Sequence, residues 1–449
     1  MKRTVVIIAF LGALIVPVSL VGTVATAASS SPPKLPAMLL SIGQIPTTTT
    51  DPPTVSTGRP AGLIQAGDSK TNCIYVGDST GLPAVEQTIG ITYNCIETFD
   101  ADPAWSDWVS PWVTHNPYAS SFYVWLRADP TGHQIIITQT LIPTSVSTDP
   151  NWLAECATGD FNTYATQLAT NLVSTGFGYS VIRLGPEMNG DWEIDSLGAT
   201  AASWQQWGQC FAQEVTAMRA VAGGDFLFDW NVNAGTDTKI PFADYYPGNA
   251  YVNIIGVDAY DESAGVVAIP AVGQPGRFAA LAAEPGGIDA VDAFAAANGK
   301  PLSIPEWGVM STQGDDPTYV TGMGSFVATH DVAYESYYDV GDANVYQLDP
   351  GQAPLSLAAY ALQQRVSYVT TMLAEVADGI TTPIALRYQR ATREREKAIA
   401  DKLGALLRAV EAQSEPASNV VPIERGADDS SRAKPYGPFR AQFQLRPRA

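Results

Sequence analysis

The sequence predicts an α/β protein built on a (β/α)8 barrel. Between about residues 70 and 362, eight short runs of apolar and β-branched residues alternate with longer helical stretches. This alternation is typical of βα units around a parallel sheet. The segment of about 300 residues suits a barrel of roughly 250 residues with insertions. A doubly wound open sheet is the alternative that the same alternation allows.

The expected strands cover residues 73–76, 95–99, 134–141, 180–187, 226–231, 252–260, 301–306 and 332–338. Two helices between them have the clearest pattern, at residues 161–174 and 201–221. In the second, large apolar side chains recur every three or four residues, as on the buried face of a helix: Trp204, Trp207, Phe211, Val215 and Met218. We therefore expect a barrel domain over residues 66–365.

The first 27 residues have the pattern of a secretory signal peptide. Lys2 and Arg3 precede an apolar run, and Ala25-Thr26-Ala27 has the small residues of a cleavage site. An uncleaved membrane anchor is the alternative, because the apolar run is close to the length that spans a bilayer. We expect a secreted, extracellular protein, either free or associated with the cell surface.

The segments that flank the barrel differ from it in composition. Residues 28–65 are rich in Ser, Thr and Pro, which predicts an extended linker. Residues 366–449 form a charged extension, with an amphipathic helix expected at residues 387–413 and a partly disordered end. This helix either packs on the barrel or binds a partner.

Acidic residues outnumber basic ones, at 45 against 25, which gives a net charge of −20. Such a charge repels nucleic-acid phosphates and anionic lipid surfaces. We therefore exclude nucleic acid as a partner. After signal cleavage no other stretch is long and apolar enough to span a membrane, and we expect a monomer.

Four cysteines in an exported chain favour two disulfides over a free thiol or a metal site. The sequence alone leaves three pairings open. We favour Cys73 with Cys95, because these residues open the first two strands of the predicted barrel, which are neighbours. Cys156 and Cys210 would then pair between adjacent helices.

Two glutamates lie at the carboxyl ends of predicted strands, where barrels carry their active sites. Glu187 ends the fourth strand and Glu306 ends the seventh. Because side chains alternate along a strand, Glu187 should share a face with Arg183 and Gly185, and Glu306 with Leu302 and Ile304. If both faces point inward, the carboxylates converge at the barrel mouth. The alternative is that each glutamate is a salt-bridged residue at a strand end.

Paired carboxylates perform glycoside hydrolysis, in which one protonates the leaving oxygen and the other attacks the sugar or activates water. Each glutamate also lies close in sequence to a tryptophan, Trp192 or Trp307, that can stack on a sugar face. The motifs RLGPEMNG and PEWG that contain them resemble those of retaining (β/α)8 glycosidases, most closely glycoside hydrolase family 26, the β-mannanase group. The resemblance covers about residues 70–362.

This resemblance implies Glu187 as the general acid/base and Glu306 as the nucleophile. It also implies that Arg183 and Asn189 support the site and that Tyr260 contacts the nucleophile. The expected activity is cleavage of internal β-glycosidic bonds of a polysaccharide, with mannan favoured, through a retaining double displacement. The position before the acid/base, which is His in family 26 and Asn in many relatives, is Pro186 here. Proline donates no hydrogen bond, so mannan specificity depends on other contacts.

In the expected mechanism Glu187 begins protonated, because the charge of Glu306 and partial burial raise its pKa, while Glu306 stays ionised. No cofactor is expected. The three histidines lack the H-E-x-x-H spacing, so no metal site is predicted either. The alternatives are the same chemistry on β-glucan, xylan, or a cell-envelope glycan, a carbohydrate-binding barrel without catalysis, and an interaction protein that acts through its tail.

Other polar and aromatic residues at strand ends are weaker candidates. Trp230, Asn231 and Asn233 at the end of the fifth strand are expected to line the sugar subsites. Asp258 and Glu97 are rival carboxylates, although one catalytic pair suffices for the reaction.

Overall fold

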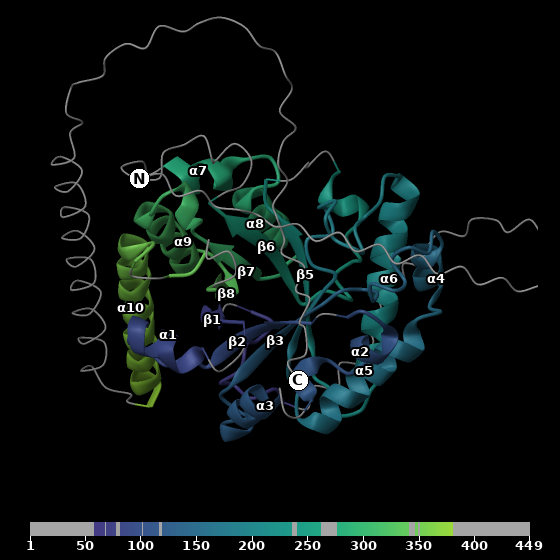
Figure 1. Ribbon diagram of the computed structural model, residues 1–449, viewed down its shortest axis with the longest axis horizontal. Coiled ribbons are helices and arrows are strands. Elements are labelled where there is room, and N and C mark those ends of the chain that lie inside the picture. The colour runs from purple at the N-terminus through teal and green to yellow at the C-terminus, as the bar shows by residue number, and fades with distance from the viewer. Residues whose placement is uncertain are drawn as a thin grey trace, which may run out of the picture. The chain divides into compact units, whose positions relative to one another are not determined.

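The structure is a computed structural model that describes residues 58–379 except 68, 78–80, 101, 116–118, 236–239, 262–275, 341–345 and 349–350. Eight parallel strands form a closed barrel in chain order, and the first strand pairs with the eighth (Figure 1). This confirms the predicted fold class and excludes the open sheet. The expected signal peptide and the helix at 387–413 lie outside the described residues.

The strands are β1 (Thr71–Tyr75), β2 (Cys95–Phe99), β3 (Gln134–Gln139), β4 (Val181–Leu184), β5 (Leu227–Asn233), β6 (Ile254–Tyr260), β7 (Leu302–Gly308) and β8 (Val332–Tyr338). The α-helices are α1 (Leu82–Ile89), α2 (Trp105–Trp108), α3 (Ala119–Ala128), α4 (Trp152–Thr158), α5 (Asn162–Thr175), α6 (Ala201–Arg219), α7 (Gly276–Ala283), α8 (Ile288–Ala297), α9 (Pro317–Thr329) and α10 (Pro354–Gly379). Three short 3-10 helices are η1 (Trp112–Thr114), η2 (Phe242–Asp244) and η3 (Ser311–Gln313).

The barrel interior is layered, because alternate residues of each strand point inward. Its floor is apolar and is formed by one buried cluster: Ile64, Cys73, Cys95, Ile136, Val181, Leu227, Ile254, Ala333 and Tyr334. Two residues further along the strands the inward positions become polar, at Glu97, Thr138, Arg183 and Asp229. The polar layer above an apolar floor is what places charged groups beneath the barrel mouth.

A second and larger core fills the space between the strands and the surrounding helices. Helix α6 contributes the predicted stripe to it, with Trp207, Phe211 and Val215 wholly buried. The helix begins with a capping box, in which Thr200 accepts a hydrogen bond from the backbone N–H of Ser203 and the Ser203 hydroxyl accepts one from the backbone N–H of Thr200. The spacing of apolar residues in the sequence therefore predicted the buried face of α6 correctly.

The segment before β1 packs against the barrel floor. Ile64 is wholly buried, and the guanidinium of Arg59 donates to the carbonyls of Ile64, Tyr179 and Asp225 at 2.5–2.6 Å. Burial lowers the pKa of Arg59 to about 10. The expected boundary between linker and barrel, at residues 65 and 66, thus falls inside a packed segment.

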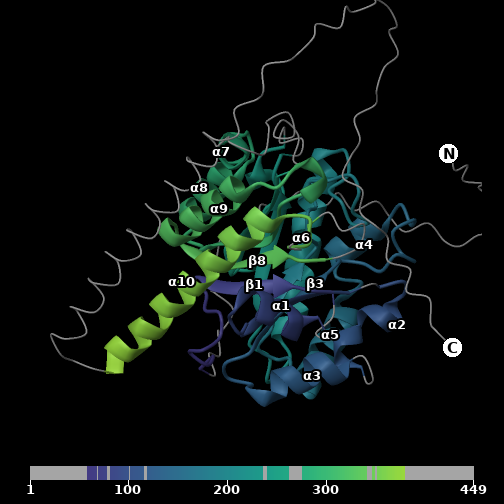
Figure 2. The same cartoon turned by 60° about the vertical axis from the view of Figure 1, so that its left-hand side comes forward.

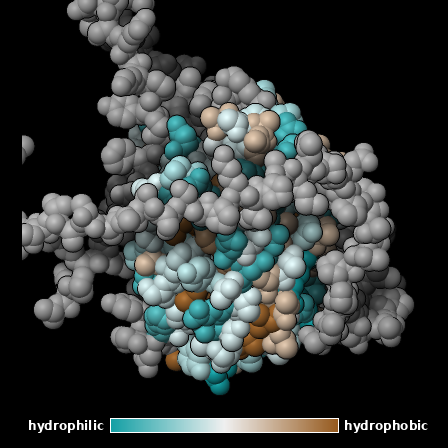
Figure 3. Space-filling view, turned by 90° about the vertical axis from the view of Figure 1, so that its right-hand side faces the viewer, coloured by the Kyte–Doolittle hydropathy of each residue, from teal (hydrophilic) through white to brown (hydrophobic). Residues whose placement is uncertain are grey.

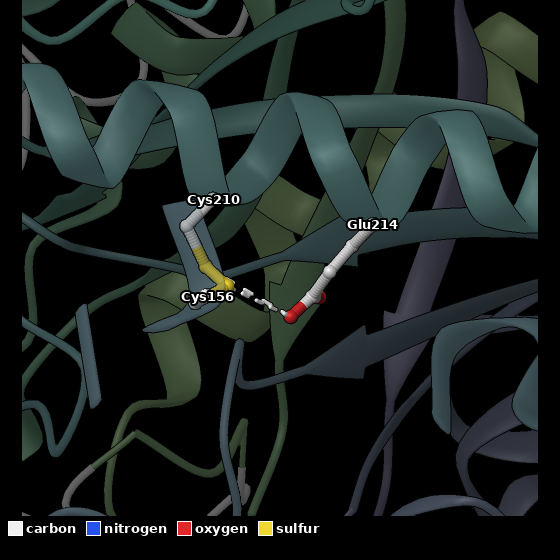
Figure 4. Close-up of side chains that lie close together, drawn as sticks. All are labelled: Cys156, Cys210 and Glu214. Atoms are coloured by element: carbon white, nitrogen blue, oxygen red, sulfur yellow. Dashed lines mark hydrogen bonds between the residues drawn. A yellow bond between two sulfur atoms is a disulfide. The ribbon is translucent and has the colours of Figure 1, made fainter. Parts of the chain in front are cut away.

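Both predicted disulfides are present. Cys73–Cys95 joins β1 to β2 at the floor, and Cys156–Cys210 joins α4 to α6 with the Cα atoms 4.9 Å apart. Figure 4 shows Glu214, one turn after Cys210 on α6, with its carboxyl turned toward the second disulfide. Its Oε1 lies 3.5 Å from Sγ of Cys156, and its Oε2 has no hydrogen-bond partner within the described part of the chain.

Helix α10 lies against α1, and Figure 2 shows its carboxyl-terminal part running past the barrel. Its first turn is capped by Asp315, whose carboxylate accepts hydrogen bonds from the backbone N–H groups of Leu355 and Ser356. Among the described residues, no helix is long and apolar enough to cross a membrane. The face in Figure 3 is mostly hydrophilic or neutral, with scattered hydrophobic spots.

Candidate active site

Arg183 is the centre of the polar layer. Its side chain is wholly buried, and its guanidinium donates to three carboxylates, those of Glu97 (3.1 Å), Glu306 (2.5 Å) and Asp258. It also donates through Nε and Nη2 to Oδ1 of Asn231, at 2.9 and 2.7 Å. A buried guanidinium with every direction occupied is a rigid, fixed positive charge. Arg183 on β4 therefore orients acidic side chains that come from β2, β6 and β7.

Glu306 enters this network from β7. One of its oxygens accepts from Arg183, and the other accepts from the hydroxyl of Tyr260 at 2.8 Å. Its backbone N–H donates to Oδ1 of Asp258 at 3.0 Å. With both oxygens held by donors, the Glu306 carboxyl is fixed in one orientation. The residue is only 3% exposed, so it faces the barrel mouth with little solvent around it.

The predicted strand face of Glu306 is wrong. Ile304 packs in the outer core, whereas Ser303 points inward and donates from its hydroxyl to Asp229 at 2.6 Å. Strict alternation from Ser303 would turn Glu306 outward. The register of β7 against β8 shifts between Ile304 and Trp307, and this irregularity turns Glu306 back into the barrel.

The predicted placement of Glu187 on a strand is also wrong. Strand β4 ends at Leu184, and Gly185 follows in the left-handed region with φ 57°. A Cβ at Gly185 would lie 2.7 Å from the ring of Trp207, so only glycine fits this turn. Glu187 is itself left-handed, with φ 52°, which is a strained conformation for a residue with a side chain. The carboxyl therefore reaches the site from a tight loop.

Glu187 is held from two sides. Its Oε1 accepts from Nδ2 of Asn233 at 2.7 Å, and its Oε2 accepts from the indole Nε1 of Trp192, also at 2.7 Å. Its backbone N–H donates to the carbonyl of Asn231 at 3.0 Å. Asn189 lies beside it, paired with the backbone of Asn233. Like Glu306, Glu187 is only 3% exposed.

The carboxylates of Glu187, Glu306 and Asp258 converge, with oxygen atoms that all lie within 4.8 Å of one another. Burial raises the pKa of Asp258 well above its usual value, against the attraction of Arg183, and the neighbouring Glu306 and Glu187 raise it further. Burial and the neighbouring carboxylates thus favour the protonated form of Asp258 within the cluster. Closely spaced carboxyl groups of this kind are what acid/base chemistry requires.

Two further acids lie deeper in the barrel. Burial raises the pKa of Glu97 to about 7, which the charge of Arg183 opposes. Burial also raises the pKa of Asp229 to about 6, against hydrogen bonds from Ser303 and Tyr334. Gly256 makes room for this layer, because a Cβ there would lie 2.8 Å from Oδ1 of Asp229. Both acids have little exposure to the barrel mouth, so they act on the site through its network.

The part of the chain that carries both glutamates matches a known protein family. Residues 161–316, which include both Glu187 and Glu306, match the model of glycosyl hydrolase family 26. This stretch, which spans β4 to β7, is a glycosyl hydrolase family 26 domain. This confirms the resemblance found in the sequence motifs.

Solved structures similar to this family 26 barrel include a GH26 β-mannanase from Bacteroides ovatus, BoMan26A, at 13% identity and a TM-score of 0.49, covering 66% of this chain and 89% of that one. They also include the catalytic domain of a GH26 endo-β-1,4-mannanase from Bacillus sp. JAMB-750, at 14% identity and a TM-score of 0.46, covering 68% of this chain and 88% of that one. None of the curated proteins matches.

Aromatic rings surround the Glu306 side of the site. Tyr75 packs on Phe99 and Tyr338 with ring centroids 4.5 and 4.9 Å away, and Tyr260 packs on Tyr346 at 4.7 Å. These rings come from the ends of β1, β2, β6 and β8 and from the segment after β8. Apart from Tyr260, these rings were not predicted from the sequence. The signal was present, because Tyr75, Phe99 and Tyr338 each lie two residues after an inward position.

Two tryptophans predicted to bind substrate do not face the site. Trp230 is wholly buried on the outer side of β5, against Tyr245 and Tyr246. Trp307 is wholly buried on the outer side of β7, where its indole N–H donates to Glu335 at 2.5 Å. Both predictions were wrong, because side chains alternate along a strand. Trp230 lies between the inward Asp229 and Asn231 on β5, and Trp307 follows the inward Glu306 on β7, so both rings point outward.

Asn231 does point inward, but it is wholly buried, and its amide is occupied by Arg183 and Asp258. It is therefore part of the charge network and does not line a sugar subsite as predicted. Asp258 and Glu97, which were predicted as rival catalytic carboxylates, belong to the same network. The sequence could place them on inward faces, but it could not show that all of them share one arginine.

Proposed function

We propose that the protein is an exported, retaining glycoside hydrolase that cleaves internal β-glycosidic bonds of a polysaccharide, with mannan favoured. Glu187 is the general acid/base and Glu306 is the nucleophile. The supporting observation is the pair of convergent glutamates. One oxygen of each lies within 4.8 Å of one oxygen of the other, which supports the close spacing of retaining enzymes, roughly 5 to 5.5 Å, over the roughly 6.5 to 9.5 Å of inverting ones.

The two glutamates have environments suited to different tasks. Glu306 is held by the positive charge of Arg183 and by the Tyr260 hydroxyl, which keeps it anionic and aimed for attack. Glu187 accepts hydrogen bonds from the neutral donors Asn233 and Trp192 and lies close to Asp258. A carboxyl that is oriented by neutral donors beside a second acid is placed to give and to take up a proton. This difference in surroundings supports Glu187 as the acid/base and Glu306 as the nucleophile.

In the first step, Glu306 forms a bond to the anomeric carbon while the bond to the leaving oxygen breaks, and Glu187 gives its proton to that oxygen. In the second step, water attacks the anomeric carbon and loses a proton to Glu187, and the bond to Glu306 breaks. The sugar keeps its anomeric configuration after two inversions. Each glutamate thus returns to its starting state.

The choice of mannan rests on the family 26 match, and the residue before the acid/base leaves it open to test. Pro186 has neither an N–H nor a polar side chain, so it offers a sugar no hydrogen-bond donor. β-Glucan, xylan and cell-envelope glycans are the competing substrates. Export is supported by the signal pattern of residues 1–27, and an amino terminus at Ala28 in secreted protein would verify it.

The test is release of reducing sugar from mannan, galactomannan, xylan and β-glucans, with the anomer of the first product identified by NMR. Glu306→Gln is run in parallel, with Glu155→Gln on α4 as a control outside the site. We expect activity on one polymer, a β-configured product, and loss of activity only in Glu306→Gln. Activity that survives Glu306→Gln would overturn the site and point to Glu97 or Asp258. Folded protein that binds glycan but cuts none of the polymers would favour a non-catalytic carbohydrate-binding barrel.

A further inference from the structure

The acid/base Glu187 is positioned from a strand other than its own. The turn after β4 has already left the strand when it reaches Glu187, and Pro186 contributes no N–H to hold it. The loop is instead attached to β5, where the Glu187 backbone N–H donates to the carbonyl of Asn231. Two residues further along β5, Nδ2 of Asn233 donates to Oε1 of Glu187 at 2.7 Å.

Asn233 is itself held in place. The side-chain amide of Asn189 pairs with both backbone groups of Asn233, donating from Nδ2 to its carbonyl at 2.9 Å and accepting through Oδ1 from its N–H at 2.8 Å. This two-point contact fixes the last residue of β5 relative to the loop that carries Glu187. The loop after β4 therefore holds the backbone of Asn233. The side chain of Asn233 in turn holds the carboxyl of Glu187 on that loop.

The two donors divide the Glu187 carboxyl between them. Trp192 donates to Oε2 and Asn233 donates to Oε1, so these two contacts orient the plane of the carboxyl. Trp192 follows Glu187 by only five residues on the same loop, so it moves with that loop. Asn233 ties the carboxyl to β5. Asp258 on β6, which shares a side-chain hydrogen bond with Glu187, also lies beside it, together with Glu306 on β7 and the cation of Arg183 on β4.

We propose that Asn233 is a positioning residue for the acid/base, and that Asn189 acts on catalysis by holding Asn233. This inference rests on the proposed function. Amide N–H bonds favour the ionised carboxylate that forms when Glu187 has given its proton to the leaving oxygen. The same carboxylate then removes a proton from water in the second step. Asn233 therefore stabilises and orients Glu187 between the two steps.

The variants are Asn233→Ala, Asn233→Asp and Asn189→Ala. The matched control is Asn162→Ala, which removes a side-chain amide bond to Gln213 on the outer helices. Loss of a hydrogen bond to a charged group predicts a fall in kcat of about ten- to a hundredfold for Asn233→Ala on the polysaccharide, with KM changed by less than about twofold. An aryl glycoside with a dinitrophenolate leaving group should lose less, because its departure needs no proton.

The pH profile separates positioning from a merely structural role. Without the Asn233 donor the carboxylate is disfavoured, so the alkaline limb of kcat/KM should move to higher pH. Asn233→Asp should move it further, because a second negative charge opposes ionisation of Glu187. Asn189→Ala should move it in the same direction by less. A uniform loss on both substrates with an unmoved alkaline limb would overturn the proposal.

A second readout needs no activity. The indole N–H of Trp192 donates to Glu187, so its NMR resonance, assigned with Trp192→Phe, reports the ionisation of that carboxyl. We expect the midpoint of its pH titration to rise in Asn233→Ala and to stay unchanged in Asn162→Ala. An unchanged midpoint in Asn233→Ala would refute the role of Asn233, whatever the activity. An inactive wild-type protein with a shifted midpoint would sink the proposed function and leave the contact intact.

Discussion

Replacing Glu214 by glutamine should raise the free energy of unfolding relative to the wild type. This gain should grow as the pH rises. Glu214 is wholly buried on α6, and burial raises the pKa of its carboxyl well above the usual value, with Asp195 raising it further. In the unfolded chain the same group ionises at its ordinary pKa. Folding must then take up a proton at any pH between these two values, so the protein loses stability as the pH increases. Glutamine has almost the same shape and no proton to take up.

The magnitude follows from the linkage of one proton. Between the unfolded and the folded pKa, the wild-type protein loses up to about 1.4 kcal/mol of unfolding free energy for each unit of pH because of this group. The variant does not, so its advantage over the wild type should grow by about that amount per unit. Urea titrations at pH 4.5, 5.5 and 6.5, with the disulfides intact, measure it. Asp160→Asn, an exposed change of equal charge, is the control.

A difference between Glu214→Gln and the wild type that stays constant with pH would refute this reasoning. It would mean that the carboxyl is already ionised in the folded protein and is compensated there. The contact of Oε1 with the sulfur atoms of the Cys156–Cys210 disulfide could not then be that of a neutral acid.

Three further predictions concern the site and the cores. Tyr260→Phe removes the hydroxyl that donates to Glu306 at 2.8 Å, so kcat/KM should fall about ten- to a hundredfold while the urea midpoint stays unchanged. Replacing Cys156 and Cys210 by serine opens a loop with a sequence separation of 54, which should lower the free energy of unfolding by about 4 kcal/mol in denaturant titrations. Trp230→Ala empties a wholly buried position, so it should cost about 3 to 5 kcal/mol of stability and leave KM unchanged; a raised KM at full stability would restore Trp230 as a sugar contact.

The barrel could be predicted from sequence because its strands are short, apolar and regularly spaced between helical segments. Their ends were harder to place. The predicted fourth strand continued to residue 187, whereas β4 stops at Leu184. The signal that ends it was in the sequence, since Gly185 and Pro186 are both residues that break strands. Glu187 was thus predicted at the correct end of the correct strand, although it lies on the loop after β4 and not on the strand itself.

The site could be predicted only in part, because local alternation decides which side chains share a face and closure of the barrel decides which of them meet. Alternation places Trp230 outward, between the inward Asp229 and Asn231, and could have excluded it. At Glu306 the same rule misleads, because an irregularity in β7 changes the face. The sharing of Arg183 among acids of β2, β6 and β7 depends on the closed sheet, and no pattern within one strand reports it.

The central claim is that Glu306 forms a covalent bond to the sugar, and trapping that intermediate tests it most directly. A 2-deoxy-2-fluoro aryl glycoside of the sugar that the polymer panel identifies slows the second step, so the glycosyl-enzyme accumulates. Mass spectrometry of peptides should then find one added glycosyl group on Glu306, and none in Glu306→Gln. An active enzyme that forms no adduct, or forms it on Glu187, Asp258 or Glu97, would contradict the account.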